Sequence, residues 1–100
     1  PVIGPEERAR GAVVVDCLFG SGLTRPLSDD LVKLLSDLAA THDHAVAIDL
    51  PSNVESDSGR CLGPVSPYDL TVALGAWKWA HWAMPAAARM GALRLVEIGI

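Results

Sequence analysis

Basic residues are scarce in this sequence and never gather into a patch. The eight lysines and arginines are scattered singly, and the formal net charge is −4. A nucleic-acid-binding surface neutralises several phosphates with clustered Lys and Arg side chains. We therefore expect no nucleic-acid partner.

Long apolar runs are also missing. No run approaches the ~20 apolar residues of a membrane span, and the first residues, PVIGPEERARG, hold no apolar core of a secretory signal. These absences predict a cytoplasmic protein that makes no membrane contact. The two cysteines, Cys17 and Cys61, lack the CxxC spacing of a metal or redox motif, so no disulfide is implied. The absence of a GxSxG elbow and of a Walker A motif excludes two common enzyme classes.

Apolar runs and turn residues alternate in an order typical of an α/β fold. The β-branched run at 12–19 predicts a strand covered on both faces. Ser28 is placed to cap a helix of about three turns, with Asp29 and Asp30 in its first turn and leucines at helical spacing behind them. The remaining segments predict three strands, a loop without periodicity and a short helix that starts at a proline: 44–50, 69–75 and 92–100; 51–67; and 85–90. This order predicts one domain with a mostly parallel sheet.

Two carboxylates end apolar runs, Asp16 in the first strand and Asp49 in the second. An unpaired carboxylate inside a strand is costly. Ligands of parallel α/β sheets bind beyond the carboxyl ends of the strands, so the two acids are candidates for one shared crevice. The alternative is that either acid caps a turn by accepting backbone N–H groups. Their position in the sequence leaves both interpretations open.

The turn GSGLTR follows the first strand and is a weak dinucleotide signature, because Arg25 replaces the third glycine and Pro26 delays the helix. Its glycines allow close approach of a ligand, and Arg25 suits a phosphate. An ordinary turn is the alternative.

The other candidate residues are aromatic or histidine. Trp77, Trp79 and Trp82 predict a core or subunit-interface cluster, with stacking on a ring or cation as the alternative. His81 is a candidate acid or base, but without a visible partner we interpret it as structural. Two further histidines flank Asp43 and are expected to be solvated loop residues, namely His42 and His44.

Four separated segments carry a family resemblance: DCLFGSGLTRPL, AIDLPSNVESDSGRCLGP, DLTVALGAWK and GALRLVEIGI. In this order they resemble the second half of the YjeF N-terminal domain, the NAD(P)H-hydrate epimerase family, over about 13–100. The resemblance implies a Rossmann-like three-layer α/β/α sandwich, of which residues 1–100 form the C-terminal part of a single domain. It also implies a homodimer and, in many bacteria, fusion to an ADP/ATP-dependent dehydratase domain.

The activity that the resemblance implies is epimerisation of the R and S forms of hydrated NADH and NADPH, a cofactor repair reaction. By matching position, Asp49 is the general acid/base and contacts the substrate, while Asp16 and Ser52 ligate a potassium ion. The nucleotide-binding segment implied in the same way is Gly20, Ser21, Gly22, Leu23, Thr24, Arg25 and Pro26.

The sequence departs from the family pattern in three places. Asn53 stands where the family has glycine, and Asn tolerates positive φ better than most residues. Glu55 replaces an Asp, and the glycine-rich asparagine motif that precedes the first strand in the family does not occur in this chain. Lys78 keeps its family position but is followed by the bulky stretch WAHWAMP. Asn53, Glu55 and the missing motif favour the alternative function, a catalytically degenerate domain that binds a ligand or a protein.

Overall fold

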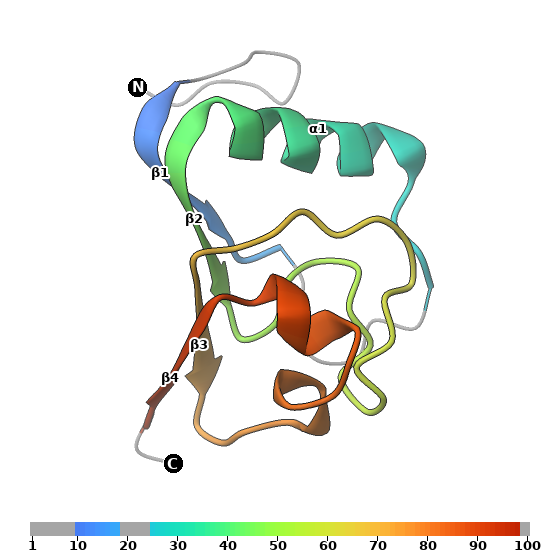
Figure 1. The fold of residues 1–100 in the computed structure, drawn as a ribbon, viewed down its shortest axis with the longest axis vertical. Coiled ribbons are helices and arrows are strands. Elements are labelled where there is room, and N and C mark those ends of the chain that lie inside the picture. The colour runs from blue at the N-terminus through green and yellow to red at the C-terminus, as the bar shows by residue number, and fades with distance from the viewer. Residues whose placement is uncertain (1–9, 19–24, 99–100) are drawn as a thin grey trace.

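The computed structural model describes residues 10–18 and 25–98, and its framework is a four-stranded parallel sheet (Figure 1). The strands are β1 (Gly11–Asp16), β2 (His42–Ile48), β3 (Leu70–Leu74) and β4 (Ala92–Val96), in the order β1-β2-β3-β4. Every neighbouring pair is parallel. The predicted Rossmann-like α/β class is confirmed.

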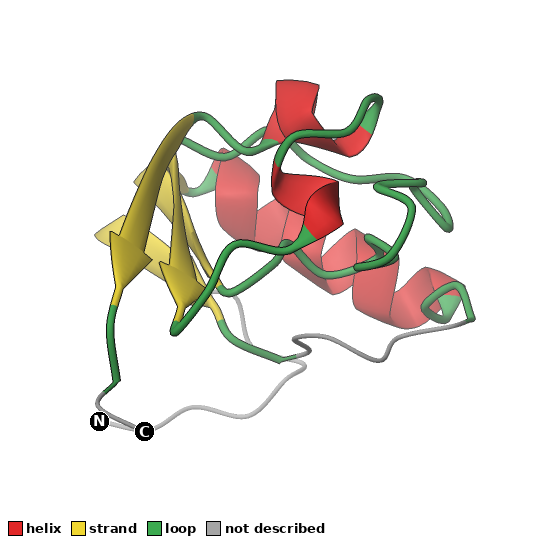
Figure 2. Ribbon diagram, turned by 90° about the horizontal axis from the view of Figure 1, so that it is seen from below, coloured by secondary structure: helices red, strands yellow, loops and turns green. Residues whose placement is uncertain are grey.

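The segments between the strands lie on one side of the sheet, as Figure 2 shows. Helix α1 (Asp29–Ala40) joins β1 to β2, and residues 49–69 join β2 to β3. Two short 3-10 helices, η1 (Trp79–His81) and η2 (Ala86–Arg89), join β3 to β4. Parallel crossovers are nearly always right-handed, so a strand order that never reverses places them on the same face. The described residues therefore supply two of the three layers that the family resemblance implies.

The other face of the sheet is mostly apolar, and no described helix covers it. The strand register aligns Val15 with Val46, whereas Ala47 aligns with Thr71 on the covered face. Val13 and Val15 are each 51% exposed, while Ala47 and Thr71 are fully buried. The sequence predicts that both faces of the first strand are covered, and for the described part of the chain this prediction is wrong. Apolar residues on both alternating sets make a strand suitable for burial, but burial itself needs a covering layer.

The hydrophobic core lies beside the sheet, between the 49–69 connection and the two 3-10 helices. It consists of Leu50, Val54, Ala80, Ala86 and Met90. The predicted loop 51–67 contributes to this core, since Pro51–Val54 are buried and Val54 pairs with Cys61 in an isolated bridge. This loop lacks periodicity because its turns, not a regular element, place its side chains.

The local predictions hold best for the helix. Ser28 caps α1 and accepts a hydrogen bond from the Leu31 N–H at 3.3 Å, with Asp29 and Asp30 in the first turn. The expected strand at 12–19 ends earlier, at Asp16, and the one at 92–100 ends at Val96. Phe19 and the last two residues lie outside the described part.

The expectation that His42 and His44 are loop residues is wrong, because both belong to β2. His42 aligns with Gly11 of β1, and His44 aligns with Val13. Pairing with the neighbouring backbone, rather than side-chain polarity, extends the strand to them. None of the described helices is both long enough and apolar enough to span a bilayer.

Candidate functional site

Asp16 is the last residue of β1 and is 4% exposed. Its Oδ1 accepts hydrogen bonds from the Ser52 hydroxyl at 2.7 Å and from the Leu18 N–H at 3.3 Å. Its Oδ2 accepts from the Ser52 N–H at 2.9 Å and from the Tyr68 hydroxyl. Four donors thus replace the water that a buried carboxylate loses. The contact with Leu18 shows that Asp16 does cap its own turn, while Ser52 and Tyr68 come from other segments.

Tyr68 is a site residue that sequence reasoning missed. It precedes β3, where nothing in its own segment points toward a residue 52 positions earlier. Burial raises the pKa of Tyr68 above its ordinary value, and the hydrogen bond to Asp16 raises it further. The phenol therefore stays protonated and remains a donor to Asp16. A weak signal was available, because this is the single tyrosine of the chain and lies next to a strand.

Asp49 directly follows β2 and has a positive φ of 69°. This conformation is unfavourable for residues other than glycine, although Asp and Asn tolerate it better than most. The Asp49 N–H donates to the Val72 carbonyl at 2.7 Å, which holds the turn against β3. The Asp49 carboxylate therefore leaves the sheet at the carboxyl end of the strands, as the sequence predicts.

Lys78 is the charge partner of Asp49. Its Nζ lies 2.6 Å from Asp49 Oδ1, and the two side chains are 25% and 13% exposed. The sequence singled out Lys78 only by its family position and gave it no partner. The sequence separation of 29 residues explains why no local pattern reveals the pair.

His81 is completely buried and connects the same two residues. The Lys78 N–H donates to His81 Nδ1 at 2.9 Å, so the ring hydrogen lies on Nε2 and is donated to the Asp49 carbonyl at 2.6 Å. Both ring nitrogens are therefore satisfied. This agrees with the structural interpretation of His81 and supplies the partners that the sequence did not show.

The nucleotide-binding segment is only partly described. Gly20, Ser21, Gly22, Leu23 and Thr24 lie outside the described residues, whereas Arg25 and Pro26 are exposed. Directly after them, the Leu27 N–H donates to Asn53 Oδ1 at 2.9 Å. The roles assigned to this segment stay predictions.

Asn53 confirms the conformational expectation for its position, with a φ of 78°. It is fully buried, and its Nδ2 donates to the Pro64 carbonyl at 3.1 Å. Together with the bond from Leu27, this contact ties two other segments to the turn at Asn53. Asn53 thus keeps the backbone shape of a glycine and adds hydrogen bonds that glycine lacks.

The tryptophan cluster is not part of the core. Trp77, Trp79 and Trp82 are 37%, 68% and 60% exposed, so the core interpretation is wrong. Trp77 contacts His81 edge-on at a centroid distance of 5.4 Å and Trp82 at 5.1 Å. The reason is that the small residues between the tryptophans, such as Ala80, occupy the core instead. The subunit-interface interpretation stays a prediction.

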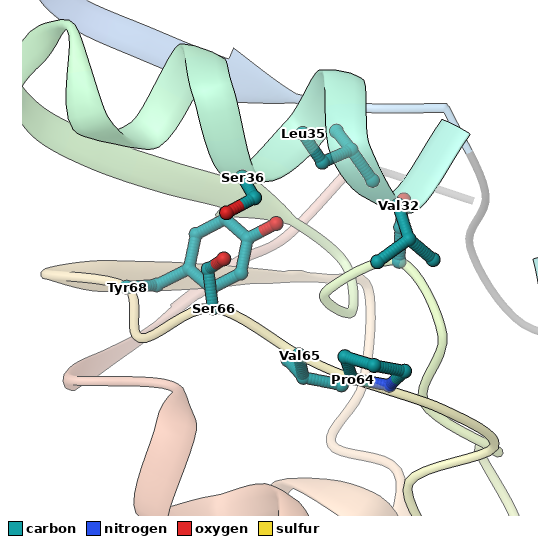
Figure 3. A pocket seen from close by; sticks show the side chains of 8 residues that line it. Val32, Leu35, Ser36, Pro64, Val65, Ser66 and Tyr68 are labelled. Carbon is teal, nitrogen blue, oxygen red and sulfur yellow. The ribbon is translucent and has the colours of Figure 1, made fainter. Parts of the chain in front are cut away.

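A pocket of about 130 Å³ lies beside the Asp16 cluster, between α1 and 64–68 (Figure 3). Its lining includes Ser52 and Tyr68, which both bond to Asp16, together with Ser36 of α1. Ligand pockets typically measure ~300–1,000 Å³. The described pocket is therefore large enough for waters or an ion but too small for a dinucleotide.

The side-chain oxygens of Asp16 and Ser52 are of the kind that bind a hard cation. Within the described ranges, no group of three or more His, Cys, Asp or Glu side chains gathers as a metal site. Asp16 and Ser52 instead offer carboxylate and hydroxyl oxygens, which are the ligands of alkali and alkaline-earth ions. The Ser52 hydroxyl donates its hydrogen to Asp16 and keeps oxygen lone pairs for a cation. These two residues would hold such an ion, which would offset the buried negative charge.

Fold and site together define a parallel α/β domain of the Rossmann-like class, with acidic side chains at the carboxyl ends of β1 and β2. Residues 3–80 match the family model of the YjeF-related protein N-terminus. The chain belongs to this family.

Curated relatives are named either as NAD(P)H-hydrate repair enzymes or as NAD(P)H-hydrate epimerases. The chain is 35% identical over 99 residues to a Synechocystis sp. protein named bifunctional NAD(P)H-hydrate repair enzyme Nnr, covering 99% of this chain and 19% of the relative. It is 28% identical over 88 residues to the NAD(P)H-hydrate epimerase of Levilactobacillus brevis, covering 88% of this chain and 41% of the relative. A protein of that name from Achromobacter xylosoxidans is 43% identical over 51 residues, or 51% of this chain and 24% of the relative. The chain thus spans less than half the length of these relatives.

Proposed function

We propose that the protein containing this chain epimerises the R and S forms of hydrated NADH and NADPH, in a cofactor repair reaction. The carrying observation is the Asp49 carboxylate, held at the end of β2 by a 2.6 Å contact with Lys78. Family membership and the names of the relatives support the same substrate class. The substrate is a reduced nicotinamide ring that carries a hydroxyl group.

The proposed reaction breaks and re-forms one carbon–oxygen bond. The protonated form of Asp49 gives its proton to the ring hydroxyl, which leaves as water and leaves a positive charge on the ring. Water then adds to the other face of the ring, and its surplus proton returns to Asp49. No electron is gained or lost in the sum. The negative charge that Asp49 carries after giving up its proton favours the cationic ring.

The test compares Asp49→Asn with Asp43→Asn in the full-length protein. Asp43 is an exposed carboxylate of β2 and provides a matched control. We expect Asp49→Asn to lower kcat for interconversion of the purified R and S hydrates by ~10²-fold or more, because proton transfer by a positioned side chain contributes that much. Asp43→Asn should retain the wild-type rate.

Two outcomes would contradict the proposal. Equal rates for wild type and Asp49→Asn would remove Asp49 from the acid/base role. A wild-type protein that binds the hydrates in calorimetry without interconverting them would instead establish the alternative, a catalytically degenerate binding module.

We further propose potassium as the cofactor, held by Asp16 and Ser52. An ion that binds only the folded state raises its melting temperature. We expect a higher Tm for the full-length protein in KCl than in N-methylglucamine chloride of equal ionic strength, and loss of that difference in Ser52→Ala. Equal Tm values in the two salts would argue against a potassium site.

We also propose a linked dehydratase domain, a homodimer and a cytoplasmic location. The name of the Synechocystis relative describes a bifunctional enzyme, which supports a dehydratase domain in the same or a partner polypeptide. Exposed tryptophans on the β3–β4 connection support a homodimer. Cys17 and Cys61 are both free thiols, which suits the reducing cytoplasm, where these cofactors are used.

A further inference from the structure

A closed circuit of contacts surrounds Asp49. Lys78 Nζ contacts the Asp49 carboxylate, the Lys78 N–H contacts the His81 ring, and that ring contacts the Asp49 carbonyl. Each link is between 2.6 and 2.9 Å. Backbone and side chain of Asp49 are therefore fixed by the same short segment, 78–81.

The circuit leaves one carboxylate oxygen available. Lys78 occupies Oδ1, and within the described residues Oδ2 of Asp49 makes no hydrogen bond. The described part of the chain has no fully buried side-chain oxygen without a partner, so Oδ2 is not completely buried, in a side chain that is 13% exposed. A single oxygen of fixed direction is what proton transfer to one ring hydroxyl requires.

We propose that Lys78 is the positioning residue of Asp49, and that its ammonium group holds Oδ1 so that Oδ2 faces the hydrated nicotinamide ring. This inference rests on the proposed function. It assigns Lys78 an effect on the rate of the chemical step rather than on substrate affinity, since the ammonium group is bound to Asp49.

The Lys78 ammonium group is not needed to hold the backbone of the turn at Asp49. The turn at Asp49 is already held by its N–H bond to Val72 and by the His81 bond to its carbonyl. Removing the ammonium group therefore leaves the backbone of the turn supported. Without the ammonium group, the Asp49 carboxylate can rotate.

The experiment uses the full-length protein with Lys78→Met, Lys78→Arg and Lys78→Ala. Methionine keeps much of the apolar stem without the charge, and arginine keeps the charge. Lys33→Met is the matched control, because Lys33 also forms an ion pair, with Asp37 at 3.2 Å, but on the exposed side of α1. The variants are assayed for epimerisation of the purified hydrates beside wild type and Asp49→Asn.

We expect Lys78→Met to lower kcat by ~10- to 100-fold, the scale of a misplaced reacting group, with KM within about threefold of wild type. Lys78→Arg should recover most of the loss, and Lys33→Met should match wild type. In Lys78→Ala, added ethylammonium should raise kcat in a saturable manner, which a merely structural role would not produce.

Wild-type kcat in Lys78→Met, or a change confined to KM, would overturn the inference. An active wild type with an inactive Asp49→Asn would then still support the proposed function. If Lys78→Ala does not fold, the contrast between the methionine and arginine variants decides alone.

Discussion

At the scale of single residues, the notable feature is a buried acid that needs no basic partner in the described part of the chain. Asp16 ends an apolar strand, yet Ser52, Leu18 and Tyr68 satisfy both of its oxygens. Removing one partner of such a group costs about 1–3 kcal/mol, because the remaining acceptor stays desolvated. Asp16 therefore joins the ends of β1 and β2 to the start of β3.

The raised pKa of Tyr68 gives a test of this junction. The folded protein binds the phenol proton more tightly than the unfolded chain, whose tyrosine ionises near pH 10. The stabilisation is therefore complete below about pH 10 and is lost as the pH rises beyond it. Because the chain has one tyrosine, the phenolate band that grows near 295 nm in an alkaline titration comes from Tyr68 alone. We expect no phenolate signal until unfolding, followed in parallel by circular dichroism.

The control for this titration is Tyr68→Phe. We expect this variant to lose about 1–2 kcal/mol of unfolding free energy at neutral pH, measured by urea denaturation, because Asp16 loses a donor. It should also lose much of the stability change above pH 10. A phenolate signal near pH 10 in the folded wild type would contradict the buried contact.

At the scale of elements, the junctions between helices and strands depend on backbone shapes that few residues adopt. Asp49 and Asn53 have positive φ after β2, and Gly75 and Gly91 have positive φ at the two ends of the β3–β4 connection. These turns bring Asp49, His81 and Lys78 to one place. The same helices and strands, joined by turns of another shape, would not bring these three side chains together.

Substitution of Gly91 and of Gly75 by alanine distinguishes backbone strain from steric clash, because both glycines have a positive φ but only Gly91 has close neighbours. A Cβ at Gly91 would lie 2.4 Å from the carbonyl oxygens of Asp69 and Tyr68, whereas at Gly75 its nearest neighbours are Ile98 atoms at 3.6 Å. The two residues have φ of 69° and 77°, so the strain of alanine is similar, about 1–2 kcal/mol. We expect Gly75→Ala to cost about that amount and Gly91→Ala clearly more, measured by urea denaturation. Equal losses would show that the backbone around Gly91 moves freely.

At the scale of the whole molecule, the sheet is covered on one face only by the described elements. Val13, Val15, Leu74 and Val96 are all at least 36% exposed on the other face or its strand ends. Exposed apolar surface marks an interaction site or an aggregation risk when it is contiguous, although His44 and Arg94 share this face by register. The strand sequences are suited to burial on both sides, which the single described layer does not provide.

The double substitution Val13→Thr with Val15→Thr tests the open face in the 100-residue chain. Threonine keeps the β-branched shape but is polar, so binding of a hydrophobic dye such as ANS should fall. Because both valines are half exposed, the free energy of unfolding should change by less than about 1 kcal/mol. A loss of 2 kcal/mol or more would show that this face is covered in the folded chain. Val46 and Val72, at the centre of the same face, are left unchanged in this variant.

The sequence by itself determined the order of elements, the α/β class, the cap at Ser28 and the placement of Asp16 and Asp49 at strand ends. It could do so because periodicity, caps and strand-end position are written within a few neighbouring residues. Only the tertiary structure decided that Tyr68 bonds to Asp16, that Lys78 pairs with Asp49 and that the tryptophans stay outside the core. These partners lie 52 and 29 positions apart, and only the packing of crossovers on one face of the sheet brings them into contact.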